Sequence, residues 1–211
     1  TLGGSSSING LIYVRGQAQD YDHWAALGNP GWSYADVLPY FIKSEGNARG
    51  SIDSHGGTGP LKVSDIGAKH ELIEAFIASA EQIGVPRTSD FNGRQQEGAG
   101  YYQLTTSKGL RCSTAKGYLG PARSRPNLHI ETDAMATGLI MRGKRAIGVD
   151  FRQNGRMRKA MAHTEVILSA GAIQSPQLLQ LSGIGPRALL QSLEVPVVHE
   201  LPGVGENLQD H

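Results

Sequence analysis

The sequence predicts a mixed α/β fold (α+β overall), and three observations lead to it. Residues 69–83 carry the apolar periodicity of an amphipathic helix. Several short apolar runs separated by turn residues follow residue 127, which is typical of antiparallel strands. Residues 165–183 then combine an apolar run, a glycine turn and a second helical pattern. With 211 residues, 39% of them hydrophobic, the chain is long enough for one large domain or two small ones.

Two helices are expected near the start of the chain. Within residues 17–27 three apolar side chains recur three positions apart, which is helical spacing, and residues 28–31 supply the turn residues that end that helix. Ser33 with Asp36 three residues later resembles a capping box. The second helix therefore begins after Ser33 and ends near Glu45.

The middle of the chain predicts a loop, a short strand and a helix. Residues 46–60 contain five glycines without periodicity, which favours an exposed loop. Residues 61–64 begin a short strand. The helix at residues 69–83 is followed by Gly84, at the position of a left-handed cap.

The second half predicts three or four strands, mostly antiparallel. Turn candidates lie at residues 142–144 and 153–155, and the second contains Asn-Gly, the strongest short hairpin signal. The last strand, Glu165 to Ser169, is expected to lead through small residues into a helix capped by Ser175 and ended by Gly183. A strand that leads through small residues to a helix N-terminus brings backbone N–H groups close to a phosphate or nucleotide.

Composition excludes several function classes. The net charge of +1 and the scattered basic residues imply no surface that follows a phosphate backbone, so we expect no nucleic-acid partner. No apolar run approaches the roughly 20 residues that a membrane-spanning helix needs. The single cysteine, Cys112, excludes an intrachain disulfide and fits a reducing compartment. We expect a cytoplasmic protein, with peripheral attachment at the inner membrane as the alternative.

Motifs of catalysis and metal binding are absent. The sequence contains no G-x-S-x-G elbow, no phosphate-binding P-loop, and no H-E-x-x-H or paired-cysteine metal pattern. Residues 183–188 match G-x-G-x-x-A, but a helical pattern precedes them where a dinucleotide fold requires a strand. A helix cap and a new helix beginning at Pro186 explain them better. The seven histidines are scattered and are expected to be surface or satisfied core residues.

The opening stretch TLGGSSSING has two interpretations. Adjacent glycines let a backbone approach a flat or anionic ligand closely, and the serines and Asn9 can form hydrogen bonds to its oxygens. The other interpretation is a flexible Gly/Ser linker. Composition alone does not choose between them.

Five separated motifs carry a resemblance to a known family. They are TLGGSSSINGLIYVRG, DYDHWAALGNPGWSYADVLPYF, GTGPL, GAIQSPQLLQLSGIG and PGVGENLQDH. In this order they resemble the glucose-methanol-choline (GMC) oxidoreductases, most closely the choline and alcohol dehydrogenase-like branch. The chain then looks like an internal fragment of such an enzyme, and His211 ends the last motif without being the catalytic base.

The resemblance implies part of an FAD-binding Rossmann-like domain and part of a substrate-binding domain with an antiparallel sheet. Residues 1–45 and 112–211 are expected in the FAD-binding domain, and residues 46–111 on the substrate side. The positions that match the family's FAD contacts are Thr1, Gly3, Gly4, Ser5, Asn9, Gly10, Leu11, Ile12, Ala136, Ala170 and Gly171. Some relatives bind FAD covalently through a histidine where this chain has Ile8, so noncovalent FAD is expected.

The implied activity is oxidation of the CH–OH group of a small-molecule alcohol by hydride transfer to flavin N5. The alcohol is choline or an aliphatic or aromatic alcohol, and the electron acceptor is oxygen or a quinone-type carrier. No catalytic residue and no metal ligand is assigned, because the family's catalytic histidine and its partner belong to a segment that would follow this chain. The alternatives are an inactive remnant or a β-rich binding module, should the 211 residues be the whole protein.

Overall fold

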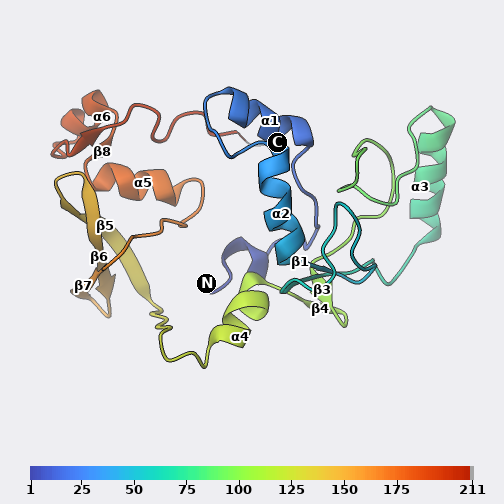
Figure 1. Cartoon of the computed structure of the whole chain (residues 1–211), viewed down its shortest axis with the longest axis horizontal. Coiled ribbons are helices and arrows are strands. Elements are labelled where there is room, and N and C mark those ends of the chain that lie inside the picture. The colour runs from blue at the N-terminus through green and yellow to red at the C-terminus, as the bar shows by residue number, and fades with distance from the viewer. Residues whose placement is uncertain (210–211) are drawn as a thin grey trace. The chain divides into compact units, whose positions relative to one another are not determined.

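The structure, a computed structural model, describes residues 1–209. His211, which ends the last sequence motif, lies outside the described residues. The chain divides into two compact units, Thr1–Leu128 and His129–His211, and each is considered by itself. Figure 1 shows the helices and strands of both units in chain order. The class is mixed α/β, as expected.

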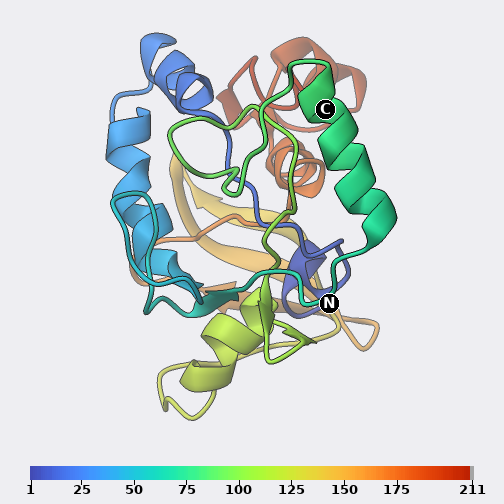
Figure 2. The same cartoon turned by 90° about the vertical axis from the view of Figure 1, so that its right-hand side faces the viewer.

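Both early helices form where the sequence predicts them. They are α1 (Ala18–Ala26) and α2 (Tyr34–Ser44). The Ser33 hydroxyl accepts a hydrogen bond from the Asp36 N–H at 3.3 Å, and the Asp36 carboxylate accepts one from the Ser33 N–H at 3.1 Å, which confirms the capping box. The two helices contact each other, and the rings of Tyr21 and Phe41 form an edge-to-face contact. Figure 2 shows α1 and α2 as consecutive blue helices of the first unit.

Short extended segments pair in the middle of the first unit. Strand β1 (Glu45–Asn47) pairs in parallel with β2 (Leu61–Val63), whose Val63 is buried. Leu104 forms antiparallel bridges to Ser64 on one side and to Ile12 on the other. The N-terminal segment around Ile12 is thereby joined, through backbone hydrogen bonds, to the strands that follow α2.

The predicted exposed loop at residues 46–60 is only partly exposed. Strand β1 occupies its start, and His55, Gly56 and Gly59 are buried. The glycines are buried because the loop folds back onto the end of α2, where a Cβ at Gly56 would overlap the carbonyl oxygen of Ile42. The prediction of exposure was therefore wrong for this part of the loop.

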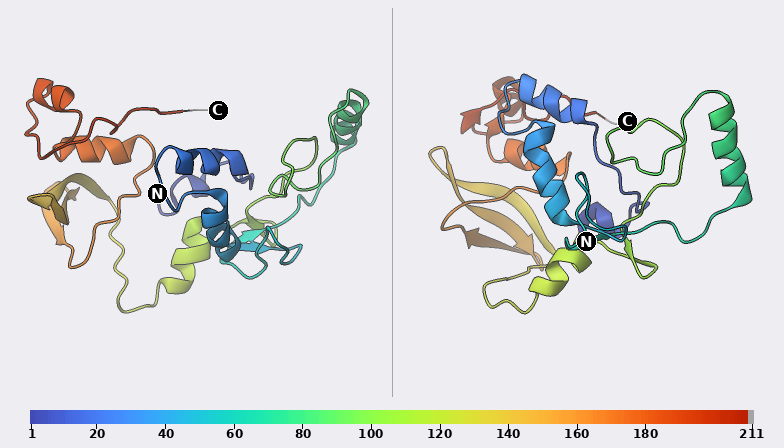
Figure 3. Two further views of the ribbon diagram at one scale, coloured as in Figure 1. Left: turned by 45° about the horizontal axis from the view of Figure 1, so that its top comes forward. Right: turned by 45° about the vertical axis from the view of Figure 1, so that its right-hand side comes forward.

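Helix α3 (Glu71–Gln82) confirms the predicted helix, and Gly84 follows it with a φ of 90°. Only Ile77 is buried among its apolar side chains, whereas Leu72 and Phe76 are each 71% exposed. Figure 3 shows α3 standing apart from α1 and α2 in the first unit.

The remaining elements of the first unit are short. They are a 3-10 helix η1 (Gly4–Ser7), the antiparallel strands β3 (Thr106–Ser107) and β4 (Leu110–Arg111), a π-helix η2 (Ala115–Leu119) and α4 (Gly120–Ala122).

A three-stranded antiparallel sheet begins the second unit. Its strands are β5 (Ala134–Arg142), β6 (Arg145–Gln153) and β7 (Arg156–Met161), in that order. Both predicted hairpin turns are confirmed: Gly143 has a φ of 59°, and Asn154 and Gly155 have values of 50° and 74°.

The expected last strand, Glu165 to Ser169, does not form, and this prediction was wrong. Its side chains alternate in exposure as a strand's would, but no strand among residues 1–209 pairs with it. An unpaired extended segment lacks the inter-strand hydrogen bonds that define a strand.

The following helix, α5 (Gln174–Leu181), has Ile173 rather than Ser175 as its N-cap, which corrects the predicted cap. The Ser175 hydroxyl instead accepts a hydrogen bond from the Ala170 N–H at 3.0 Å. Beside β5, the Leu139 N–H donates to the Ser182 hydroxyl just after α5, at 2.8 Å. In Figure 1, α5 lies next to β5.

The G-x-G-x-x-A stretch is a helix cap followed by a new helix, as expected. Gly183 ends α5 with a φ of 80°, and α6 (Arg187–Ser192) begins after Pro186. Between them, β8 (Ile184–Gly185) pairs in parallel with β9 (His199–Glu200). No helix within residues 1–209 is long and apolar enough to cross a membrane.

Replacing Gly56 with alanine is expected to destabilise the first unit. The added Cβ would overlap the Ile42 carbonyl oxygen and lie 2.7 Å from that of Glu45, and such overpacking costs about 1–3 kcal/mol. Urea unfolding measures the change. Gly67→Ala is the control, because nothing lies within 4 Å of its Cβ and a change below about 0.5 kcal/mol is expected. Equal stability of the two variants would contradict the close approach.

Candidate cofactor-contacting site

The glycine block at the start of the chain adopts a conformation that needs glycine. Gly3 and Gly4 have φ values of 91° and 54°, where side chains other than glycine are strained, and η1 follows at once. A Cβ at Gly3 would also overlap the Ser7 hydroxyl. Space is open at Gly4 and Gly10, where nothing lies within 4 Å of an added Cβ. The block is thus ordered by its glycines and leaves its backbone accessible there.

Arg111 and Thr114 hold this block in place. The Arg111 guanidinium donates to the Ser6 carbonyl at 3.0 Å, and to the side-chain and backbone oxygens of Asn9 at 3.0 and 2.8 Å. The Thr114 hydroxyl donates to the Gly3 carbonyl at 3.2 Å, and its N–H donates to the Ser6 hydroxyl at 3.0 Å. These contacts argue against a flexible linker.

The next residues, 11–15, form a segment with one edge paired. The Leu11 carbonyl accepts from the Thr105 N–H at 2.8 Å, and the Tyr13 N–H donates to the Gln103 carbonyl at 2.8 Å. The Asn92 side-chain amide continues this edge, accepting from the Arg15 N–H at 2.7 Å and donating to the Tyr13 carbonyl at 3.0 Å. The Leu11 carbonyl and the backbone groups of Tyr13 and Arg15 are therefore occupied by residues 92–105.

The other edge of the segment is open. Within residues 1–209 no hydrogen bond joins the backbone groups of Gly10, Ile12 or Val14 to another part of the chain. The side chains of Ile8, Ile12 and Val14 are exposed as well, with Ile8 at 80%. This edge offers backbone donors and apolar side chains to a ligand.

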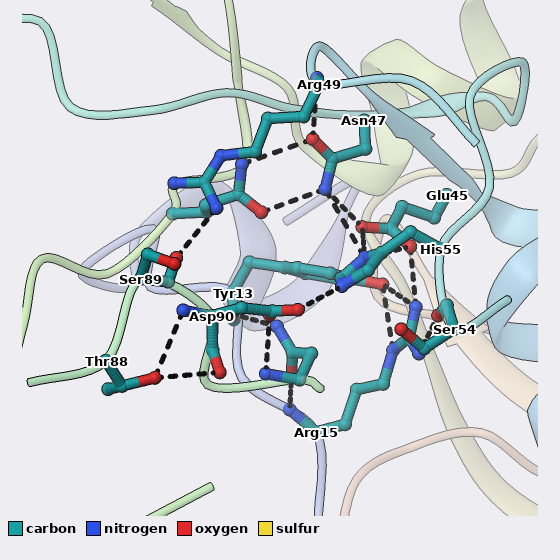
Figure 4. Close-up of polar contacts among 12 residues, drawn as sticks. Tyr13, Arg15, Glu45, Asn47, Arg49, Ser54, His55, Thr88, Ser89 and Asp90 are labelled. Atoms are coloured by element: carbon teal, nitrogen blue, oxygen red, sulfur yellow. Dashed lines mark hydrogen bonds and ion pairs between the residues drawn. The ribbon is translucent and has the colours of Figure 1, made fainter. Parts of the chain in front are cut away.

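Arg15 ends the segment in a buried group of charged side chains. Its guanidinium contacts the Glu45 carboxylate at 2.6 Å, and the His55 ring lies 2.8 Å from the same carboxylate and 3.0 Å from that of Asp90. Figure 4 shows His55 between Glu45 and Asp90. Arg15, Glu45 and His55 are buried, and Asp90 is half-buried. Below, these four residues are called the Glu45 cluster.

Amides and a second ion pair extend the Glu45 cluster toward the surface. The Asn47 amide donates to Glu45 and to Gln103, each at 2.8 Å, and Gln103 donates to Asp65 at 2.8 Å. Burial raises the pKa of the Asp65 carboxyl, but hydrogen bonds from Arg49 and Gln103 outweigh it, and the net shift is downward. Asp65 therefore stays ionised beside the amide.

Tyr13 lies against the Arg15 guanidinium. Burial raises the pKa of its phenol and exceeds the opposite effect of the neighbouring Arg15. Tyr13 accordingly remains a neutral phenol, whose oxygen accepts from Arg15 at 3.4 Å.

A cavity of about 510 Å³ opens beyond Arg15 in the first unit. Its walls are residues 15–19, which lead into α1, Tyr34 and Leu38 of α2, Asp53 and Ser54, and residues 91–97. None of the residues predicted to contact FAD lines it. The cavity therefore lies at the far end of the segment from the glycine block.

The predicted positions in the second unit are exposed. Ala136 lies in β5 opposite Phe151, beside an irregularity in the register. Ala170 and Gly171 precede α5, and Gly171 has a φ of 93° with open space around it. Within this unit, the backbone around Gly171 has open space, whereas the Ala170 N–H is bound by the Ser175 hydroxyl.

Comparison with known proteins identifies the family. The family model of the GMC oxidoreductases matches residues 1–211. The chain belongs to this family.

Curated GMC relatives are similar over the whole chain. An oxygen-dependent choline dehydrogenase of Serratia proteamaculans is 55% identical over 215 residues, covering 100% of this chain and 39% of the relative. One from Pseudomonas fluorescens is 54% identical, covering 100% of this chain and 38% of the relative. The chain thus spans about two fifths of the length of these relatives.

Solved GMC-like structures share the fold. An FAD-dependent oxidoreductase from Chaetomium thermophilum matches with a TM-score of 0.91 and 36% identity, over 98% of this chain and 38% of the other. Pyridoxine 4-oxidase from Mesorbium loti matches with a TM-score of 0.91 and 30% identity, over 98% of this chain and 41% of the other.

Sequence reasoning missed the Glu45 cluster of this GMC chain. Glu45 was expected only as a helix end, and His55 lay in a predicted exposed loop. The one available signal was the group of glycines around His55, since buried glycines often mark close backbone approach. The partners are 10 to 35 residues apart in the sequence: 30 for Arg15 and Glu45, 10 for Glu45 and His55, and 35 for His55 and Asp90. No local pattern pairs them.

Replacing Arg111 with alanine is expected to loosen the glycine block. Three hydrogen bonds from a charged donor are lost, and a net cost of about 1–3 kcal/mol in unfolding free energy follows. Thermal unfolding of the complete polypeptide measures it. Arg125→Ala is the control, because its exposed side chain has no hydrogen bond or ion pair within residues 1–209. An Arg111 variant as stable as the control would sink the assigned role.

Proposed function

We propose that this chain is the internal portion of an FAD-dependent oxidoreductase that oxidises the CH–OH group of an alcohol, with choline as the substrate. The observation that carries the proposal is identity of 53–55% with choline dehydrogenases over 100% of the chain. FAD in the name of the C. thermophilum relative supports the cofactor. We also propose the domain division that the resemblance implies, with residues 1–45 and 112–211 in the FAD-binding domain and residues 46–111 on the substrate side.

The open edge of the first unit fits a flavin. A flavin is flat and apolar over much of its ring, with oxygen and nitrogen acceptors at its rim. Ile8, Ile12 and Val14 offer apolar contact, and the free backbone N–H groups of Gly10, Ile12 and Val14 can donate to the rim. Gly4 leaves room for close approach of the backbone.

The proposed FAD contacts in this unit are those that the family resemblance implies: Thr1, Gly3, Gly4, Ser5, Asn9, Gly10, Leu11 and Ile12. Asn9 has a second duty: its side-chain oxygen accepts from the Leu11 N–H at 3.2 Å, where Leu11 has a φ of 69°. That turn is strained for leucine, and Arg111 and Asn9 stabilise it. In the second unit Ala136, Ala170 and Gly171 are proposed contacts, supported by their small size and exposure.

The chain's part in the reaction is to bind and orient. When bound, FAD supplies the acceptor for the hydride that leaves the alcohol carbon. The ordered backbone edge of this chain would hold the flavin ring. The apolar side chains beside that edge would exclude water from the ring. None of its residues is proposed as the catalytic base. The base that takes the hydroxyl proton is expected in a segment that follows this chain in the family.

The electron acceptor is proposed to be a quinone-type carrier or oxygen. The names of the curated relatives contain the words oxygen-dependent, and this supports oxygen for this chain. A cytoplasmic location, with peripheral attachment at the inner membrane as the alternative, is supported by the single cysteine, Cys112, which is free and buried.

Noncovalent FAD is expected, because Ile8 offers no nucleophile where some relatives carry a histidine. Acid precipitation of the complete holoenzyme should release all of the yellow colour into the supernatant. An Ile8→His variant is the informative comparison, since it restores a nucleophile at an 80% exposed position. Flavin that stays in the pellet of the unmodified protein would overturn the expectation.

Choline oxidation tests the proposed function directly. The complete polypeptide that carries this chain is purified with its flavin, and choline is added without oxygen. We expect the flavin absorbance near 450 nm to bleach, about 10-fold or more faster with choline than with benzyl alcohol or butanol at equal concentration. Rapid bleaching by an uncharged alcohol and none by choline would contradict the substrate. Purified protein without flavin would instead support the inactive remnant.

A further inference from the structure

The Glu45 carboxylate is fully buried and receives hydrogen bonds from four neighbours. Arg15 approaches one oxygen at 2.6 Å, and the Gly56 N–H reaches the same oxygen at 3.2 Å. The Asn47 amide reaches the other oxygen at 2.8 Å, and His55 contacts both oxygens at 2.8 and 3.0 Å. A buried carboxylate is tolerated only with such complete pairing.

His55 is held between two carboxylates. Its Nδ1 faces Glu45, and its Nε2 lies 3.0 Å from Asp90 Oδ2. The Asn47 amide nitrogen also lies 3.4 Å from Nδ1. Both ring nitrogens of His55 therefore have polar partners, and the ring is fixed from both sides.

The Glu45 cluster forms a closed circuit with the segment that ends at Arg15. Asp90 Oδ1 accepts from the Asn92 N–H at 2.9 Å, and the Asn92 side chain binds the backbone of Tyr13 and Arg15. The Arg15 side chain returns to Glu45. The segment is therefore held twice, by its backbone through Asp90 and Asn92 and by its side chain through Glu45.

We propose that Glu45, His55 and Asp90 are positioning residues that set where residues 9–15 meet the flavin. The proposal rests on the proposed function. Because one edge of this segment is fixed by the circuit, its open edge at Gly10, Ile12 and Val14 takes up one position. A shift of this edge changes the alignment of the flavin ring with the substrate, and small misalignments lower the rate of the chemical step.

Binding of a metal or a ligand by the Glu45 cluster is a weaker interpretation. Within residues 1–209 no group of three His, Cys, Asp or Glu side chains is arranged to hold a metal ion. No buried side-chain nitrogen or oxygen in the described part of the chain lacks a hydrogen-bond partner. A small cavity of about 60 Å³ lies against His55 and Asp90. The polar groups of the Glu45 cluster form their hydrogen bonds with one another and with neighbouring residues of the unit.

The test compares charge-neutralising variants in the complete holoenzyme. Glu45→Gln and Asp90→Asn each remove one negative charge beside His55 and keep the side-chain shape. Glu74→Gln is the matched control, because Glu74 forms an ion pair with Arg87 in the same unit but on the surface. Each variant is measured for its dissociation constant for FAD, the visible circular dichroism of the bound flavin, and kcat and KM for choline.

We expect both cluster variants to bind FAD about 10-fold more weakly, which corresponds to about 1.4 kcal/mol. Their visible circular dichroism should change, and at saturating FAD kcat should fall about 10-fold while KM for choline stays within about twofold. The Glu74→Gln variant should match the unmodified enzyme in all four quantities. Far-ultraviolet circular dichroism checks that each variant is folded.

Asp90→Asn keeps the proposal falsifiable if Glu45→Gln does not fold, because the Asp90 side chain is 26% exposed and its loss is milder. A lower melting temperature with unchanged FAD affinity, flavin dichroism and kcat would overturn the positioning role. That result differs from failure of the proposed function, in which the unmodified enzyme itself would bind no flavin or leave choline unoxidised.

Discussion

The buried carboxylate of Glu45 is the constraint on which the first unit depends. Removing a charge from water is expensive, and a buried ion that loses one partner typically costs a protein 3–5 kcal/mol. Each neighbour of Glu45 must therefore keep its contact so that the buried carboxylate stays paired. Arg15 must reach it from the N-terminal segment, and His55 and the Gly56 N–H must reach it from the following loop. Few apolar residues of this unit are buried, so a continuous hydrophobic core does not hold its segments together. The Glu45 side chain holds several of them together instead.

Glycine residues make the close packing around Glu45 sterically possible. The loop that carries His55 lies directly on the backbone at the end of α2, and side chains at Gly56 or Gly59 would overlap it. Figure 4 shows the result, in which residues from the N-terminal segment, β1 and two loops converge on one buried site. Buried charged groups need partners at hydrogen-bond distance. The glycines allow this close approach because they have no side chains that would prevent it.

Local signals explain what the sequence could predict. The capping box of α2, the periodicity of α3 and the Asn154-Gly155 turn each depend on residues within a few positions of one another. The failures involve partners that are distant or absent from the described chain. Residues 165–169 have the alternation of a strand but no strand within residues 1–209 to pair with. The loop around His55 is buried by contacts with Glu45 and with Asp90, which is 35 residues away. Likewise, the positions of the FAD contacts come from resemblance to a family, because glycines and serines alone are equally compatible with a linker.

The two edges of residues 9–15 connect this packing to function. After the turn at Leu11 the backbone groups alternate in direction, so pairing of Tyr13 and Arg15 with residues 92–103 turns those of Ile12 and Val14 the other way. The same alternation separates the buried Arg15 from the exposed Ile12 and Val14. The same register therefore fixes the paired edge of the segment and leaves the backbone groups of the other edge open. A change of one residue in that register would move Arg15 away from Glu45 and leave the carboxylate without its strongest partner. The cost of burying Glu45 thus also selects which residues lie on the open edge.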